Sequence, residues 1–384
     1  MMRVVVAPDA FKGSASNLAV GRAMAAGLAD IWPEAEAIQC PLADGGEGTL
    51  AALAAAHPGQ EVVVPVVGPH GEALNAAYWC GLDGLTVIES ARAIGLPQTQ
   101  RRDPLRATSA GAGQICQAAL SAGRDRIRIA CGGSATVDGG MGLLTALGFA
   151  FLDGQGRPLA PGGGALVNLA KIVPPGQIPS GIEVWCDVTN PLLGVNGAAA
   201  VYGPQKGADA DGVRQLEAGL ARLADVLSAT FGRDPTEIVG AGAAGGLAGS
   251  LWAALGAELQ PGFDAIADHI GLDEALTGAH LVLTGEGRVD HQTAQGKTIA
   301  GVITRAQRAG VPVWAFGGEV TKAAIDWAPD DVVLVPIVAG PSSLEDAMGA
   351  TIDLIRRAVA RSFALARTGA ALPRQKSQPS PHRD

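Results

Sequence analysis

The sequence contains little of what marks disulfide-stapled, zinc-binding or membrane-spanning proteins. Its five cysteines are odd in number, lie far apart and include no CxxC pair, so we expect neither a disulfide framework nor a zinc site. No stretch approaches the ~18 uninterrupted apolar residues of a membrane span. The N-terminal apolar run is too short for a signal peptide. We therefore expect a cytoplasmic protein.

Basic blocks and aromatic residues are also scarce. The net charge is −9 and aromatic residues make up 4% of the chain. Such an acidic chain is a poor partner for nucleic acid or a membrane surface, so we expect small-molecule partners and allow for a homodimer. A chain of 384 residues is long enough for two domains.

Short apolar runs alternate with longer amphipathic segments near both ends of the chain. This alternation predicts a parallel sheet covered by helices. The expected strands are 3–7, 35–40, 60–68, 280–285, 311–318 and 331–338. The expected helices are 16–31, 47–56, 297–309, 321–327 and 343–366.

The middle of the chain has less regular strand spacing and most of the glycine clusters. We therefore predict an α/β fold with two α/β domains, one of them a discontinuous Rossmann-like parallel sheet, and an active site in the cleft between them. The discontinuous domain comprises 1–75 and 278–367, and the second domain, 76–277, is inserted. The polar segment 368–384 is expected to be a disordered tail.

Two glycine-containing segments match known nucleotide motifs only superficially. The segment 240–245, GAGAAG, fits the GxGxxG pattern of dinucleotide-binding proteins, but it lies mid-chain and only TEIV precedes it. The segment 296–298, GKT, lacks the earlier glycine of a P-loop, because position 291 is His. A nicotinamide dehydrogenase is accordingly a distant alternative.

Acidic residues follow five of the apolar strands, several beside glycine. In parallel α/β sheets the loops at the carboxyl ends of strands line the ligand crevice, so these acids could converge on one cleft. Clustered carboxylates call for a cation, and an all-oxygen ligand set favours Mg²⁺. Each acid could instead cap a helix or form a turn. The acids are Asp9, Asp44, Glu47, Asp138, Asp187, Glu286 and Asp290.

Lysines beside glycines add a second kind of chemistry. Lys12, Lys206 and Lys297 each adjoin a glycine, and lysine can contact phosphate as a point charge while glycine lets backbone amides approach. Carboxylates for a metal, lysines for phosphate and one acid to take a hydroxyl proton suit phosphoryl transfer. A lone lysine is more often a solvated surface residue, so the recurrence of the pattern carries the hypothesis.

Several long motifs resemble the bacterial type I glycerate kinases. They are APDAFKGS, LADGGEGT, DPLRATSAGAG, GGSATVDGGMGLLTALG, CDVTNPLLGVNGAAAVYGPQKGA, GAGAAGGL and TGEGRVDHQTAQGKT, in the order and spacing of that family. The resemblance runs from about Arg3 to about Ala366. It departs from the usual pattern at Ala10, Gln114 and Val137, among others.

The resemblance implies ATP-dependent phosphorylation of glycerate with Mg²⁺, normally at the 2-hydroxyl to give 2-phosphoglycerate. The alternatives are a kinase for another small hydroxy acid, and a non-catalytic regulator that binds a sugar acid or nucleotide. An intact set of acids disfavours the regulator, because a pure binder needs no general base.

The hypothesis assigns a role to each candidate residue. Asp187 ends an apolar strand and is our choice of base, and Lys12 is assigned to the transferred phosphoryl group. Asp9, Asp44 and Asp290 are the candidate Mg²⁺ ligands. The candidate substrate and phosphate contacts are Gly132, Gly133, Ser134, Thr136, Asp138, Lys206, Gly285, Glu286, Gly287 and Lys297.

Overall fold

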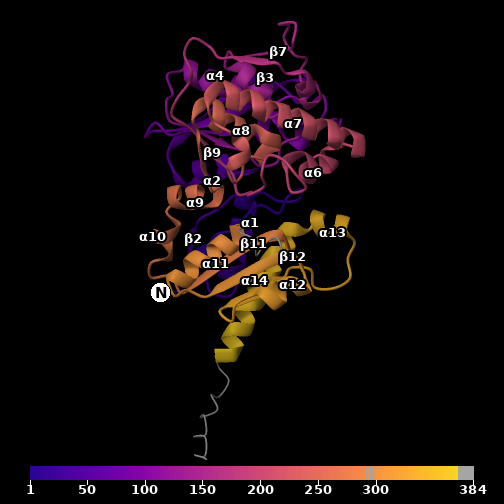
Figure 1. The fold of residues 1–384 in the computed structure, drawn as a ribbon. Coiled ribbons are helices and arrows are strands. Elements are labelled where there is room, and N and C mark those ends of the chain that lie inside the picture. Colours follow the sequence, from indigo (N-terminus) through magenta and orange to yellow (C-terminus); the bar gives the residue numbers. More distant parts are fainter. Residues whose placement is uncertain (291–292, 294–297, 371–384) are drawn as a thin grey trace, which may run out of the picture.

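The computed structural model describes residues 1–290, 293 and 298–370, and it contains two large sheets, one in each half of the molecule (Figure 1). The first sheet has five strands in the order β13-β12-β11-β1-β2, and all neighbouring strands are parallel. Both ends of the chain contribute to it, as the sequence predicts. The strands are β1 (Arg3–Val6), β2 (Glu36–Gln39), β11 (Leu281–Val289), β12 (Val313–Val320) and β13 (Val332–Pro336).

Helices α1 (Asn17–Ala29) and α14 (Thr351–Ala370) pack on each other over one face of this sheet. The Ser16 hydroxyl accepts a hydrogen bond from Ala19 N and caps α1. The core here contains Val4, Val6, Met24, Leu28, Phe316 and Phe363. The other helices of this half are α11 (Thr298–Arg308), α12 (Lys322–Trp327) and α13 (Leu344–Gly349).

The second sheet has six strands in the order β10-β9-β6-β5-β4-β3. Four of them are parallel, and β4 and β3 extend the sheet as an antiparallel hairpin. The strands are β3 (Gly59–Val67), β4 (Ala73–Gly81), β5 (Thr86–Glu89), β6 (Ile127–Ala130), β9 (Ile182–Trp185) and β10 (Glu258–Gln260).

The pairing of β3 corrects the expected domain boundary at residue 75. This strand pairs with β4 along its whole length, so it belongs to the six-stranded sheet and not to the first domain. The sequence shows an apolar run at this place but not its partner. The strand reading of the run is right, and its assignment to the first sheet is wrong.

Helices cover the six-stranded sheet and enclose an aliphatic core with Ile129, Val184, Leu220 and Leu247. They are α3 (Ala91–Ile94), α4 (Ala110–Ser121), α5 (Met141–Ala146), α6 (Ala198–Tyr202), α7 (Ala210–Phe231) and α8 (Ala243–Leu255). A separate hairpin joins β7 (Ala150–Leu152) to β8 (Lys171–Val173). None of the helices in the described ranges is both long and apolar enough to cross a bilayer.

A third hydrophobic cluster links the two halves. It includes Trp79 and Trp185 from the six-stranded sheet and Val282 and Val313 from the five-stranded sheet. Apolar residues of α2 (Thr49–Ala56) and α9 (Gly262–His269) join the same cluster, and both helices lie between the halves in Figure 1. The short helix α10 (Leu272–Leu276) follows α9 and leads the chain back to β11.

Candidate active site

Loops from the carboxyl ends of both sheets meet between the two halves. The loop after β2 touches the loop after β6, because Gly132 N donates a hydrogen bond to the Gly45 carbonyl (2.9 Å). Gly45 also lies against Gly262 at the start of α9, where a Cβ on Gly262 would be 2.9 Å from Gly45 Cα. This close backbone packing explains the glycines of the two loops and brings their acids near one another.

Lys12 and Asp44 form the ion pair at this junction. Lys12 follows β1, Asp44 follows β2, and Nζ lies 2.8 Å from Asp44 Oδ2. Burial alone would lower the pKa of Lys12, but the carboxylates of Asp44, Asp9 and Glu286 raise it above the usual value. The lysine is therefore a fixed positive charge surrounded by acids, with 58% of its side chain exposed.

Asp9 lies behind this pair and is 4% exposed. Its carboxylate accepts hydrogen bonds from Ala10 N (2.7 Å) and from Thr298 Oγ1 (2.8 Å), the first residue of α11. Burial, together with the charge of Asp44, raises the pKa of Asp9 from 3.8 to about 7. A nearby cation would stabilise the ionised form of such a buried carboxyl.

Asp187 lies two residues after the end of β9, at the other side of the junction. Its two oxygens accept from Phe263 N at 3.1 and 3.0 Å, so Asp187 sits at the N-terminus of α9. Burial raises the pKa of Asp187 from 3.8 to about 7, and the charge of Asp44 adds to the rise. The amides of Phe263 and Gly262 act in the opposite direction and lower it.

Strand β11 runs beyond the expected strand 280–285 and includes Glu286 and Gly287. Gly285, Glu286 and Gly287 lie within the strand, so their amides do not form a separate phosphate-binding loop there. A Cβ on Gly285 would collide with the Phe316 carbonyl of β12. Glu286 Oε1 accepts from Thr293 Oγ1 (2.7 Å) and its charge reaches Lys12.

The last acid of the motif, Asp290, comes just after β11. Its carboxylate lies 3.4 Å from Arg288 Nε, and this arginine also pairs with Glu319 (3.3 Å). Asp290 N donates to Thr293 Oγ1 (3.1 Å). The candidate Lys297 lies outside the described residues.

Within the segment from Gly132 to Thr136, Ser134 and Thr136 are buried, whereas Gly133 is exposed. The Gly132 amide is already bonded to Gly45, which contradicts its expected role as a free phosphate donor. Gly133 has a φ of +75° and its carbonyl accepts from Leu96 N (3.0 Å). The segment thus packs on the neighbouring α3 region.

Lys206 reaches this segment from the far side and is itself buried. Its Nζ donates to Ser134 Oγ (3.1 Å) and to the Thr136 carbonyl (2.8 Å). Burial lowers the pKa of Lys206 to about 7, although the charge of Asp138 counteracts this. Thr136 Oγ1 has no hydrogen-bond partner in the described part of the chain.

Asp138 is a structural link. It is fully buried and accepts hydrogen bonds from Ser109 N, Ser109 Oγ, Gly140 N and Gly142 N at 2.8–3.1 Å. These bonds tie the start of α5 to the start of α4. The candidate substrate contact is therefore enclosed in the protein interior.

The expected metal ligands do not form a preassembled cage. Within the described ranges, no group of three or more His, Cys, Asp or Glu side chains is arranged to hold an ion. Asp9 and Asp44 are close enough for their charges to interact, whereas Asp290 pairs with Arg288.

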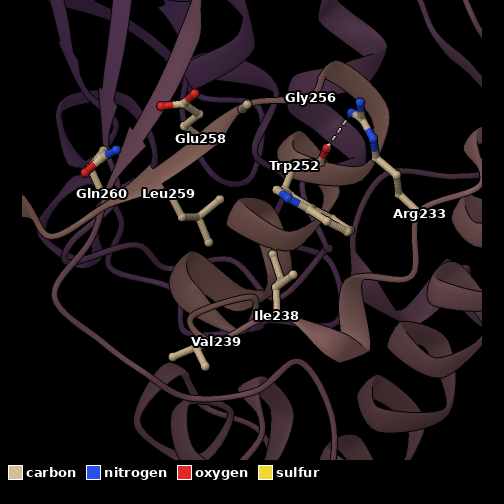
Figure 2. Close-up of a pocket in the computed structure, with 9 residues that line it drawn as sticks. Arg233, Ile238, Val239, Trp252, Gly256, Glu258, Leu259 and Gln260 are labelled. Carbon is tan, nitrogen blue, oxygen red and sulfur yellow. Dashed lines mark hydrogen bonds between the residues drawn. The ribbon is translucent and has the colours of Figure 1, made fainter.

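A surface cavity of about 440 Å³ lies beside the edge strand β10 (Figure 2). Ile238, Val239, Trp252 and Leu259 line it, and Arg233 Nη1 donates to the Trp252 carbonyl (3.2 Å). Among the candidate site residues that the structure describes, none lines it.

Phe263 is not among the residues predicted from the sequence, and Thr298 appears there only within the GKT segment 296–298. The signal for Phe263 is local: PGFD follows the short strand Glu258–Gln260 and has the composition of a helix N-terminus. The segment 240–245 is preceded by a 3₁₀ turn, Pro235–Glu237, and not by a strand, so it has no dinucleotide-binding context.

The fold is that of an α/β protein with parallel sheets, and in such folds ligands commonly bind at the carboxyl ends of the strands. Comparison with known proteins makes the class definite. Residues 4–367 match the profile of the Glycerate kinase family, and the chain belongs to this family of phosphotransferases.

Relatives and a solved structure extend the match over nearly the whole chain. The chain is 41% identical to the glycerate kinase of Bacillus subtilis (strain 168), over 96% of this chain and 99% of that protein. It is 42% identical to the glycerate 2-kinase of Escherichia coli (strain K12), over 83% and 86%. A crystal structure of a protein assigned as glycerate kinase 2 from Salmonella typhimurium LT2 has a TM-score of 0.82, at 41% identity, and covers 97% of this chain and 100% of that one.

Proposed function

We propose that the chain transfers the γ-phosphoryl group of ATP to the 2-hydroxyl of glycerate, giving 2-phosphoglycerate and ADP. Family membership supports glycerate as the acceptor, and the name of the Escherichia coli relative supports the 2-position. The reaction moves the hydroxyl proton to a protein base. The new oxygen–phosphorus bond forms as the bond to ADP breaks, and the electron pair of that bond leaves with ADP.

The observation that carries the proposal is the state of Asp187. Its carboxyl stands at a strand end beside the Asp44 loop, and its pKa of about 7 suits a base that must accept a proton at neutral pH. Lys12 is the fixed cation of the same junction and would neutralise charge on the transferred group. Closure of the two halves would exclude water from the reacting phosphate.

The donor set at the junction fits Mg²⁺. The available side-chain ligands are carboxylate oxygens, and Mg²⁺ is usually held by one or two carboxylates together with nucleotide phosphates, so no complete protein cage is needed. Asp9 and Asp44 would hold the ion, with Asp290 as the further candidate. When bound, Mg²⁺ would neutralise phosphate charge; the chain's own groups would orient the acceptor and take its proton.

The variant Asp187→Asn tests the proposed base. We expect kcat to fall by about 10³-fold or more, because an amide cannot accept the hydroxyl proton, while circular dichroism stays unchanged. In the parent protein kcat should fall as the pH drops below about 7, since only the ionised carboxyl is a base. The measurement is ADP release in a coupled assay over a panel of small hydroxy acids.

The matched control is Asp225→Asn, an exposed acid in the same half of the molecule, which should leave kcat unchanged. Near-normal turnover by Asp187→Asn would remove Asp187 from the role of base. Faster turnover of another hydroxy acid than of glycerate would overturn the substrate assignment.

A further inference from the structure

Helix α9 connects the base to the opposite half of the molecule through one residue. The amide of Phe263 donates to both oxygens of Asp187, which belongs to the loop after β9. The ring of the same phenylalanine is buried and belongs to the hydrophobic cluster shared by the two halves. The amide and the ring belong to one residue, so a shift of the residue that displaces the ring also displaces the hydrogen-bond donor of Asp187.

Helix α11 provides the seat for this ring. A Cβ on Gly301 would collide with the ring edge of Phe263, so the absence of a side chain at 301 lets the ring lie on the helix. One turn further on, the Arg305 guanidinium lies 5.7 Å from the ring centroid, within cation–π range.

Arg305 also clamps the segment that carries Phe263. Its side chain is 9% exposed and pairs with three exposed acids of α9 and α10: Asp264 (2.9 Å), Asp268 (2.6 Å) and Asp273 (3.0 Å). A guanidinium can serve several carboxylates at once, which a lysine cannot do with the same geometry. These ion pairs hold α9 and α10 against α11.

The same helix α11 begins at Thr298, whose hydroxyl donates to Asp9. The two carboxyls of the junction with a pKa of about 7 are thus held by two helices that Arg305 joins. We propose that Phe263 is the positioning residue of Asp187, and that α11 sets it through Gly301 and Arg305. This inference rests on the proposed role of Asp187 as the base.

The groups around Asp187 predict how its pKa changes when Arg305 is lost. The charges of Asp44 and Asp264 raise its pKa, the amides of Phe263 and Gly262 lower it, and Cys186 is its neighbour in sequence. Loss of Arg305 would loosen those amides and would leave the charge of Asp264 uncompensated. Both effects raise the pKa of Asp187, so a larger fraction of the enzyme would hold a protonated, inactive base at neutral pH.

The experiment compares the pH profile of kcat in Arg305→Met, Gly301→Ala and the parent enzyme. We expect the acidic limb to move to higher pH by about one unit, which is about a tenfold loss of kcat at pH 6 with recovery near pH 9. Arg305→Lys should restore part of the shift, and the KM for ATP should change little. Arg308→Met, an exposed arginine on the same helix, is the matched control.

Stability is measured alongside, because Arg305 also contributes to folding. A lower melting temperature with an unmoved acidic limb would mean that Arg305 only stabilises the fold, and it would overturn the inference. If Gly301→Ala does not fold, Phe263→Leu supplies the second test, since it weakens the seat and keeps the amide. Retained activity in Asp187→Asn would instead refute the proposed base, so the two failures are distinct.

Discussion

Asp138, Asp9 and Asp187 show how differently one fold can treat three enclosed carboxyls. Four hydrogen bonds surround Asp138, two reach Asp9, and the donors found for Asp187 are amides at the start of α9. Asp138 serves as a structural link, whereas the other two stand next to further negative charge. Ionising Asp9 or Asp187 therefore costs free energy in the protein without ligands, and such perturbed carboxyls are typical of functional sites.

The substitution Asp9→Asn should remove the cost of ionising Asp9 from folding stability and should at the same time lower activity. The folded protein keeps the Asp9 proton up to about pH 7, whereas an unfolded carboxyl releases it near 3.8. Folding stability therefore falls as the pH rises through this window, and the penalty is fully present above pH 7. We expect Asp9→Asn to raise the free energy of unfolding at pH 8 by about 1–3 kcal/mol, but not at pH 4.

Urea unfolding at the two pH values measures this effect, and activity should drop sharply in the same variant. Asp330→Asn, an exposed acid of the same half, serves as the control and should change neither quantity. An equal gain in stability at both pH values would show that Asp9 does not titrate as described.

At the scale of elements, the sequence predicts where strands lie better than it predicts which strands pair. The runs 3–7 and 280–285 are strands because β-branched and aliphatic residues end at turn signals, and both lie in the five-stranded sheet as expected. The partner of β3 could not be read from the sequence, because pairing depends on contacts formed only in the folded chain. The same limit applies to Gly132, whose amide is bonded to a loop far away in sequence.

The candidate site was predictable where a residue type follows a strand. Asp9, Lys12, Asp44 and Asp187 were found in this way, and the structure brings the first three together. Asp187 approaches Asp44 from the other half. The seat of Phe263 on α11 was not predictable, because Gly301 and Arg305 look like ordinary helix residues in the sequence. Family resemblance predicted the reaction class, and the match to the Glycerate kinase family confirms it.

The close contact between helices α1 and α14 predicts that a side chain at Gly27 lowers stability. A Cβ on Gly27 would collide with the Arg356 carbonyl and lie 2.9 Å from Val359 Cβ. Gly27→Ala should therefore destabilise the protein by about 1–3 kcal/mol, despite the better helix propensity of alanine, because two helix backbones must separate. Its kcat should be normal at 25 °C, since the contact is remote from the acids.

Denaturant unfolding compares Gly27→Ala with Gly369→Ala, a change in α14 that places a Cβ where nothing lies within 4 Å. The control should be neutral or slightly stabilising. Equal stability of the two variants would mean that the helices adjust at no cost and that the contact is not tight.

At the scale of the whole molecule, the two halves share a core. Trp185 of the six-stranded sheet packs in the same cluster as Phe263 of α9 and Val282 of the five-stranded sheet. Neither sheet would keep this surface out of water if the other unfolded. The loop contact between Gly132 and Gly45 joins the halves further through their backbones.

This shared core predicts one cooperative unfolding transition. Scanning calorimetry should show a single heat-absorption peak, with calorimetric and van't Hoff enthalpies in agreement if unfolding is reversible. Because Gly27 lies in the outer layer of one half only, Gly27→Ala shows whether destabilising that half also destabilises the other. If the halves unfold together, the whole peak moves to lower temperature. Two peaks, of which only one moves in the variant, would show that the halves are independent and that the cluster around Trp185 stabilises the junction too weakly to couple them.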